Sequence, residues 1–188
     1  MNLEDLAEQI KQCQKCGLYR AAKNAVPGEG NPSAEIMFVG EGPGQTEDEQ
    51  GRPFVGAAGK LLEELLASIG LKREDVFIAN VVKHRPPGNR DPLPEEIEAC
   101  TPWLLEQINI IKPKLIVTLG RHSMGHFMPG LRISAVHGQP KRRAGQVYLP
   151  LYHPAAALYQ NSLRQTLEED FKKIPLVINK INESNLSN

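Results

Sequence analysis

The sequence has few cysteines, no excess charge of either sign and no long apolar run. Three cysteines in 188 residues are too few for the disulfide framework of a small secreted domain. The formal net charge is zero, so a basic surface for a polyanion must be local. No apolar run approaches the ~20 residues of a transmembrane helix. Because the first residues, MNLEDLAEQIKQ, are acidic and amphipathic and do not resemble a signal peptide, we expect a cytoplasmic protein.

Apolar runs alternate along the chain with amphipathic segments. The apolar runs predict strands over residues 34–40, 75–82, 114–120 and 146–154, and Pro150 indicates that the last is edge-like or irregular. Leucine spacing with flanking glycine and proline predicts helices at the start of the chain, over 56–70, 92–113 and 121–127, and from about 163 into the 180s. This order predicts an α/β protein: a three-layer α/β/α sandwich around a four-stranded parallel sheet, in one domain over 1–188 with a frayed tail from about 183.

Polar residues and glycines stand where the predicted strands end. Ligands of parallel sheets bind beyond the carboxyl ends of the strands. Those ends carry a carboxylate, an amide, an imidazole and two glycines: Gly40, Glu41, Asn80, Gly120 and His153. The sequence therefore predicts a polar pocket at this edge of the sheet.

The cysteines and one histidine form a candidate metal site. Cys13 and Cys16 are a C-x-x-C pair after the first predicted helix. Cys100 lies on the apolar stripe of the 92–113 helix, so its thiol is expected to face inward, which is also the position of an ordinary core cysteine. His84 follows the second strand and could complete a set of three thiolates and one imidazole. Such a set suits either tetrahedral zinc or an iron–sulfur cluster.

Several long motifs together resemble one known family. The motifs GEGPGQTEDEQGRPFVGAAGKLL, IANVVK, RPPGNR and HPAAAL are similar to those of the family 4 uracil-DNA glycosylases, the thermostable, iron–sulfur type. The resemblance implies a uracil-glycosylase α/β/α fold and a [4Fe–4S] cluster of largely structural role. The family usually has cysteine where this chain has His84, so the implied ligands are Cys13, Cys16, His84 and Cys100. The alternative is an incomplete, labile cluster; we favour ligation, because imidazole is a competent donor.

The resemblance gives the strand-end residues roles toward an extruded uracil, since a base inside a duplex cannot be reached. The Phe54 ring is expected to stack on the base, which is worth ~1–3 kcal/mol. Asn80 is the expected reader, because its amide can accept from uracil N3–H and donate to O4. Gly40 and Gly42 belong to the turn that lets backbone approach the base. Glu47 is expected to wall the C5 side against the thymine methyl.

Two residues are implied in catalysis. Cleavage leaves positive charge on the sugar and negative charge on uracil, so a donor is needed at uracil O2. His153 matches the family's histidine in that role, and a neutral imidazole suffices. Glu41 is expected to position the attacking water and to support the cationic sugar. Asp48 is expected to support the turn.

The DNA backbone and groove need other residues. Phosphate contacts are expected from basic residues near the RPPGNR motif and in the last helix, and groove contacts from the segment after His153. The expected contacts are Lys83, Arg85, Arg90 and Arg164 for the backbone and Ala155, Ala156 and Leu158 for the groove. The basic triplet at 141–143 is a weaker candidate.

The predicted function is hydrolysis of the N-glycosidic bond of deoxyuridine in single- or double-stranded DNA, releasing uracil during base-excision repair. We expect a nucleoid-associated monomer, with a contact to a sliding clamp. One alternative is a uracil-DNA binder that captures the sugar covalently through a histidine. Another is a non-catalytic metal-cluster DNA-binding protein. A dinucleotide site is disfavoured, because GEGPGQ lacks the G-x-G-x-x-G spacing and no phosphate-binding G-x-x-x-x-G-K-[ST] loop occurs.

Overall fold

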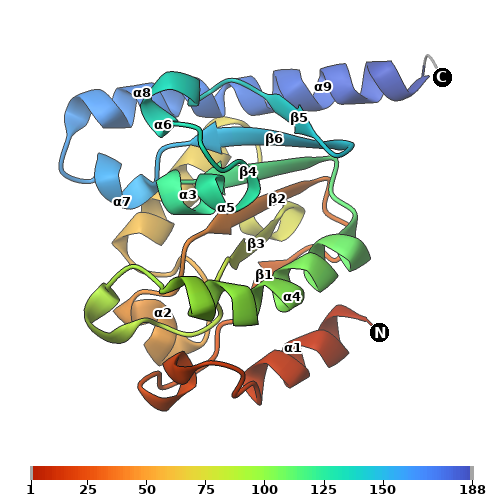
Figure 1. Cartoon of the computed structure of the whole chain (residues 1–188). Helices are drawn as coiled ribbons and strands as arrows, with labels where there is room; N and C mark the ends of the chain where they lie inside the picture. The colour runs from red at the N-terminus through yellow and green to blue at the C-terminus, as the bar shows by residue number, and fades with distance from the viewer. Residues whose placement is uncertain (1, 187–188) are drawn as a thin grey trace.

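A six-stranded sheet forms the centre of the protein in the computed structural model, which describes residues 2–186 and the side chains as far as residue 184 (Figure 1). The strand order is β1-β3-β2-β4-β6-β5. The inner strands β3, β2, β4 and β6 are parallel, and β1 and β5 pair antiparallel at the two edges. The strands are β1 (Glu29–Gly30), β2 (Ile36–Gly40), β3 (Phe77–Asn80), β4 (Leu115–Leu119), β5 (Lys141–Arg143) and β6 (Gln146–Leu151).

Helices cover both faces of the sheet. They are α1 (Leu3–Lys11), α2 (Gln45–Gln50), α3 (Ala57–Ser68), α4 (Pro94–Ile111), α5 (Arg121–Phe127), α6 (Ile133–Val136), α7 (Pro154–Ala157), α8 (Asn161–Phe171) and α9 (Lys173–Leu186). Three short 3₁₀ turns are η1 (Gly17–Arg20), η2 (Arg73–Asp75) and η3 (Pro87–Asn89).

The two faces of the sheet pack into separate cores because successive strand residues point to opposite sides. Phe38 and Val117 pack with residues of α3, α8 and α9 on one face. Met37 and Ile116 pack with residues of α4 and α5 on the other. Helix α1 packs on the outer side of α4 (Figure 1). The predicted three-layer α/β/α fold with four parallel strands is confirmed; the two edge strands, of two and three residues, are too short to leave a pattern in the sequence.

Pro150 lies within β6 without disturbing its pairing with β4. It stands opposite Thr118 of β4, and its carbonyl accepts from the Gly138 N–H at 2.8 Å on the other side of the strand. In a strand the N–H and C=O of one residue point the same way, so the missing proline N–H faces away from β4. Strand β5 ends before this point, since its Lys141 pairs with Tyr148. The prediction of an edge-like strand therefore holds for this part of β6.

The last predicted helix is two consecutive helices, α8 and α9, which meet at Lys172. Residues 183–186, for which the sequence predicts a frayed tail, belong to α9, and residues 187–188 lie outside the described part of the chain. Within residues 2–186, no helix is both long enough and apolar enough to cross a bilayer.

The connections of β2 and β4 fix the place of the site. The chain leaves β2 through α3 to reach β3 on one side, and then returns through α4 to β4 on the other side of β2. Because these connections diverge, a crevice opens between them beyond the carboxyl ends of the strands.

Candidate active site

A pocket of about 340 Å³ lies beyond the carboxyl ends of the parallel strands. It brings together side chains from the turn after β2, the loop before α3, the end of β3 and the segment after β6. The polar and aromatic lining includes Glu41, Glu47, Phe54, Asn80 and His153. Gly42 also lines it, whereas Gly40 lies behind the lining and Gly120 borders a neighbouring hollow.

The Asn80 amide and the Phe54 ring meet over Gly40. A Cβ atom on Gly40 would lie 2.4 Å from Oδ1 of Asn80 and 2.7 Å from Cζ of Phe54, so only glycine fits there. Asn80 is 2 % exposed, and its Oδ1 is buried without a hydrogen-bond partner among the described residues. Such an acceptor costs ~1–3 kcal/mol unless a ligand supplies a donor.

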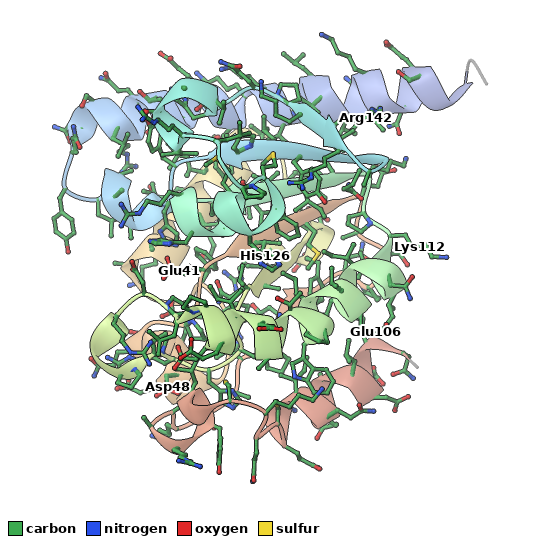
Figure 2. All side chains as sticks on the ribbon, in the orientation of Figure 1. Glu41, Asp48, Glu106, Lys112, His126 and Arg142 are labelled. Atoms are coloured by element: carbon green, nitrogen blue, oxygen red, sulfur yellow. The ribbon has the colours of Figure 1, made fainter. Side chains whose placement is uncertain are left out.

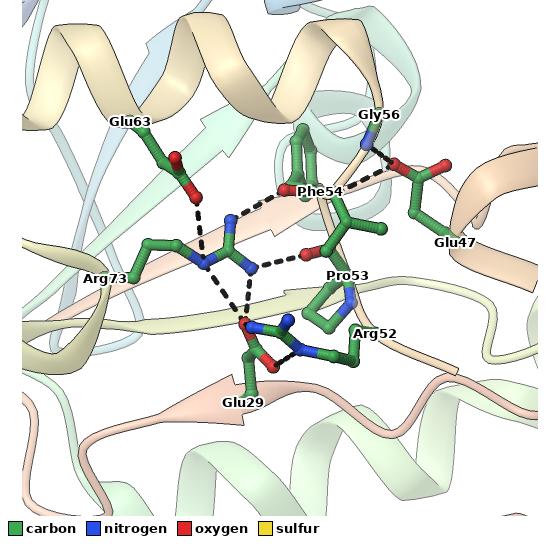
Figure 3. Close-up of polar contacts among 9 residues, drawn as sticks. Glu29, Glu47, Arg52, Pro53, Phe54, Gly56, Glu63 and Arg73 are labelled. Carbon is green, nitrogen blue, oxygen red and sulfur yellow. Dashed lines mark hydrogen bonds and ion pairs between the residues drawn. The ribbon is translucent and has the colours of Figure 1, made fainter. Parts of the chain in front are cut away.

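The loop that carries Phe54 is held from two sides (Figure 3). Phe54 has a φ of 49°, a left-handed conformation that costs about 1–2 kcal/mol for a residue with a Cβ. The guanidinium of Arg73 donates to the carbonyls of Phe54 at 2.6 Å and Pro53 at 2.5 Å, and is paired with Glu29. On the pocket side, Oε1 of Glu47 accepts from the N–H groups of Val55 and Gly56 at 3.0 and 2.8 Å. These contacts fix the aromatic ring beside the pocket.

His153 is held in one tautomer. It caps α7, with Nδ1 accepting from the Ala155 N–H at 3.0 Å. A neutral ring with Nδ1 as acceptor carries its proton on Nε2. Burial lowers the pKa of His153 to about 4, against a smaller opposing effect of Glu47, so the ring is a neutral donor at physiological pH. A Cβ atom on Gly120 would lie 3.1 Å from Cβ of His153, so this glycine, with a φ of 91°, makes room for the ring.

Glu41 lies at the end of β2 (Figure 2) and meets two residues from other parts of the chain. Nε2 of His122 is 3.7 Å from the Glu41 carboxylate and 3.2 Å from that of Asp91. Burial raises the pKa of Glu41; His122 and Arg121 lower it, and Asp91 raises it. Among the described residues, Glu41, Asp91 and His122 form the only group of three His, Cys, Asp or Glu side chains that lie as close together as a single metal ion requires.

None of the predicted metal ligands lines the pocket of Glu41. Cys13 and His84 line one cavity of about 510 Å³. Sγ of Cys13 accepts from Nε1 of Trp103, and Sγ of Cys100 accepts from the Lys83 N–H, each at 3.2 Å. Burial raises the pKa of the Cys100 thiol to about 11; Lys83 lowers it, and Cys16 and Cys13 raise it. The inward orientation predicted for Cys100 is confirmed, since this residue is 5 % exposed.

The spacing of these donors is wider than one zinc ion requires. Zn–S bonds of about 2.3 Å place tetrahedral thiolates ~3.8 Å apart. Among the described residues, no three of the cysteine and histidine donors lie within 4.8 Å of one another. The described donors are therefore not arranged as a single tetrahedral zinc ion requires, and two of the thiol sulfurs accept N–H···S bonds, which are contacts that also tune iron–sulfur ligands.

Comparison with known proteins identifies the family. A family model described as the uracil DNA glycosylase superfamily matches residues 27–174. The chain belongs to this superfamily. It is 55 % identical over 183 residues to a type-4 uracil-DNA glycosylase of Sulfurisphaera tokodaii, an alignment that covers 92 % of this chain and 83 % of the relative. Type-4 enzymes of Archaeoglobus fulgidus and Thermotoga maritima are 51 % and 47 % identical, with 92 % and 95 % of both chains covered. The family predicted from the motifs is confirmed.

One DNA contact predicted from the family's motifs is wrong. Lys83 is 0 % exposed and cannot reach a phosphate. Its Nζ donates to the Asn80 carbonyl at 2.8 Å and to Oε1 of Gln107 at 2.7 Å. Burial lowers the pKa of Lys83 to about 8, and the Cys100 thiol acts in the opposite direction. The lysine follows an apolar strand end and folds back into the core, which its position in a basic motif did not indicate.

The other predicted DNA contacts lie at the surface in different settings. Arg90 lines the pocket of Asn80 and makes two bonds to Glu96, at 2.7 and 2.8 Å. The partly exposed Arg85 donates to Oδ1 of Asn89. Arg164 is paired with Glu64 and Glu168. The 141–143 triplet is β5, which pairs with the amino-terminal half of β6, away from His153.

The segment after His153 differs in part from the prediction. Ala155 and Ala156 are exposed, as a groove contact requires. Leu158 is half-buried and packs against the core instead. Its neighbour Tyr159 is 93 % exposed, the most exposed of the large apolar side chains described. Tyr159 was not predicted as a site residue, although an aromatic residue directly after HPAAAL is a usable signal.

His122 and Asp91 were also missed. Asp91 follows the RPPGNR motif and His122 follows the third parallel strand, so each position suggested a site residue. Neither spacing shows that the two meet at Glu41.

The turn role predicted for Asp48 takes another form. Its Oδ1 accepts from the N–H groups of Lys23 and Asn24, so Asp48 ties α2 to the loop that contains those two residues.

Proposed function

We propose that this chain hydrolyses the N-glycosidic bond of a deoxyuridine extruded from DNA, releasing uracil and leaving an abasic site. The observation that carries the proposal is the buried, unpartnered Oδ1 of Asn80 beside the Phe54 ring in a pocket of about 340 Å³. Uracil N3–H is a donor that this acceptor lacks, and the aromatic ring offers a stacking surface. Cytosine has no hydrogen on N3, so it would leave the acceptor unsatisfied.

Bond cleavage develops negative charge on the uracil and positive charge on the sugar. The Nε2–H of His153 is the donor for uracil O2, and the Ala155 N–H holds the ring in the required tautomer. Because the pKa of His153 is about 4, it donates without being a cation. Glu41 positions the water and faces the developing cation. Glu47 lines the C5 side, where its carboxylate is fixed by Val55 and Gly56 and excludes a methyl group.

We infer that Cys13, Cys16, Cys100 and His84 hold a [4Fe–4S] cluster. The support is that no three of these described donors lie as close together as a single zinc ion requires, and that two of the thiol sulfurs accept N–H···S bonds. His84 is 6 % exposed and faces the cavity that Cys13 lines. When bound, the cluster would act as a cross-link between the segment after α1, the segment after β3 and helix α4.

Covalent capture of the sugar through His84 is disfavoured by the position of this histidine. It lines the cavity of Cys13 and not the pocket of Asn80 and Phe54. A non-catalytic DNA-binding role is disfavoured by the convergence of Glu41, Asn80 and His153 on one pocket.

An excision assay tests the proposal. Single- and double-stranded oligonucleotides with one uracil are incubated with the protein, and free uracil and abasic sites are measured. Denaturing electrophoresis of the same samples detects covalent capture as a shifted protein–DNA band. Release of uracil with no shifted band supports hydrolysis, a shifted band without release supports capture, and binding with neither supports the non-catalytic role.

The partners follow from this function. Uracil-containing DNA is the proposed substrate in single- or double-stranded form. We further propose that the protein is a cytoplasmic, nucleoid-associated monomer that contacts a sliding clamp. Size-exclusion chromatography with and without a clamp protein tests the monomeric state and the clamp contact.

A further inference from the structure

Lys83 is a buried cation that the proposed chemistry leaves without a role. Its side chain is 0 % exposed and lies directly behind the strand end that carries Asn80. Nζ donates to the Asn80 carbonyl at 2.8 Å and to Oε1 of Gln107, on α4, at 2.7 Å. Nε2 of Gln107 in turn donates to the Pro27 carbonyl at 2.6 Å. The lysine therefore joins the end of β3 to a helix and, through it, to the segment before β1.

We propose that Lys83 is a positioning residue, which holds Asn80 in its uracil-reading position by tying the end of β3 to α4. The inference rests on the proposed function, because it assigns Lys83 a part in reading uracil. Asn80 is the last residue of β3, and its Oδ1 has no partner among the described residues to fix it. The position from which its amide reaches the pocket therefore depends on how firmly its backbone is held.

A purely structural role explains this arrangement less well. Burying an ammonium group carries a desolvation penalty of several kcal/mol, and apolar side chains of similar volume often stabilise a core as well or better. A cation with donors aimed at two fixed acceptors gives directional restraint instead. The pocket needs such restraint, because a shift of about 1 Å in a positioning group can lower a rate 10²-fold.

The backbone of Lys83 makes a third contact. Its N–H donates to Sγ of Cys100 at 3.2 Å, and Cys100 lies seven residues before Gln107 on α4. Seven residues are close to two helical turns, so both side chains leave the same side of the helix. Helix α4 is thus a common support for the uracil reader and for a proposed cluster ligand. Because the contact to Cys100 comes from the backbone, substitution of the Lys83 side chain leaves it in place.

The test compares Lys83→Met with Lys180→Met, which removes an exposed lysine of α9. Methionine keeps the length and apolar stem and removes the donors. We expect Lys83→Met to lower the single-turnover excision rate roughly 10- to 100-fold and to raise the inhibition constant of free uracil by a similar factor. Affinity for abasic DNA and iron per chain should stay within about twofold of wild type, because neither depends on the side chain. Assays run well below the unfolding temperature of each variant.

A second pair of variants tests the restraint if Lys83→Met does not fold. Gln107→Leu removes the acceptor on α4, and Gln107→Glu keeps an acceptor there. We expect Gln107→Leu to weaken uracil inhibition and Gln107→Glu to restore most of it. The inference would be overturned if Lys83→Met had a lower unfolding temperature but unchanged uracil inhibition. If Lys83→Met does not fold, the same result in Gln107→Leu would overturn it. If wild-type protein releases uracil in that experiment, only the role of Lys83 fails; if wild type releases none, the proposed function fails first.

Discussion

A Cβ atom on Gly40 would lie 2.4 Å from Oδ1 of Asn80, closer than such atoms approach in real proteins. The glycine sits in the last position of β2 with ordinary strand geometry, so its backbone accepts any residue and only the space forbids one. The places of the Asn80 amide and the Phe54 ring beside the pocket therefore depend on the absence of a methyl group at residue 40.

Gly40→Ala should abolish most uracil excision while the protein still folds. The new methyl must displace the Asn80 amide or the Phe54 ring, and either shift should lower the rate by about 10²-fold. Single-turnover excision and thermal unfolding measure the two effects. Gly125→Ala is the control, because no atom lies within 4 Å of its Cβ position. An active Gly40→Ala enzyme would show that the amide does not read the base.

His153→Asn separates the donor from the cap. Asparagine is a good N-cap residue and keeps an acceptor for the Ala155 N–H, but it lacks the Nε2–H. We expect the excision rate to fall about 10²- to 10³-fold, as for loss of one oxyanion donor, with little change in stability. His153→Ala should lose the same activity and about 1 kcal/mol more of unfolding free energy. Comparable rates for His153→Asn and wild type would remove the ring from catalysis.

Glu41 should set the acid side of the pH profile. Burial raises its pKa above the ordinary value of 4.5, so the carboxyl becomes neutral, and the enzyme inactive, at a higher pH than an exposed glutamate would allow. His122 and Arg121 act against the shift, and Asp91 adds to it. Asp91→Asn should therefore move the acid limb of kcat/KM to lower pH, and His122→Ala should move it to higher pH. An acid limb that neither variant moves would exclude Glu41 as the titrating group.

Tyr159→Ala should affect double-stranded DNA more than single-stranded DNA. The ring is 93 % exposed, beside the segment of Ala155 and Ala156. If it stacks in the space of the extruded base, its loss should remove ~1–3 kcal/mol from the duplex substrate alone, which is about a 5- to 150-fold change in rate. Leu105→Ala, at an exposed position on α4, is the matched control. Equal losses on both substrates would contradict a wedge role.

His84→Ala should lower iron content and visible absorbance. A four-iron cluster gives about four irons per chain, and loss of one ligand should labilise it. His84→Cys should retain the cluster, because thiolate is the commoner ligand. His126→Ala, on α5, controls for the general loss of a histidine. Full iron content in His84→Ala would show that this imidazole is not a ligand.

Much of the candidate site could be predicted because it is local in the sequence. Each parallel strand is a continuous apolar run, and its first polar residue marks the carboxyl end. Glu41, Asn80 and His153 were found in this way, and all three line one pocket. The proline and glycine beside Phe54 predicted a ring outside the core, which is only partly right: the ring lines the pocket but is 5 % exposed and packs with the core residues of α3.

Residues whose roles depend on distant partners were harder to predict. Lys83 stands in a basic motif typical of a DNA contact, yet its acceptor Gln107 is 24 residues away on α4. Arg73 holds the Phe54 loop from 19 residues away, with no spacing that would signal it. His122 and Asp91 reach Glu41 from separate segments.

The amino-acid sequence by itself determined the order of strands and helices, the parallel core and the family, because periodicity, turn residues and long motifs are written in neighbouring positions. Only the tertiary structure decided which cations are buried, which aromatic ring is exposed and which side chains surround Glu41. Those outcomes depend on how α4 and α5 pack against the sheet and on how α7 packs against α3 and α8. A packing contact joins residues whose separation along the chain carries no pattern.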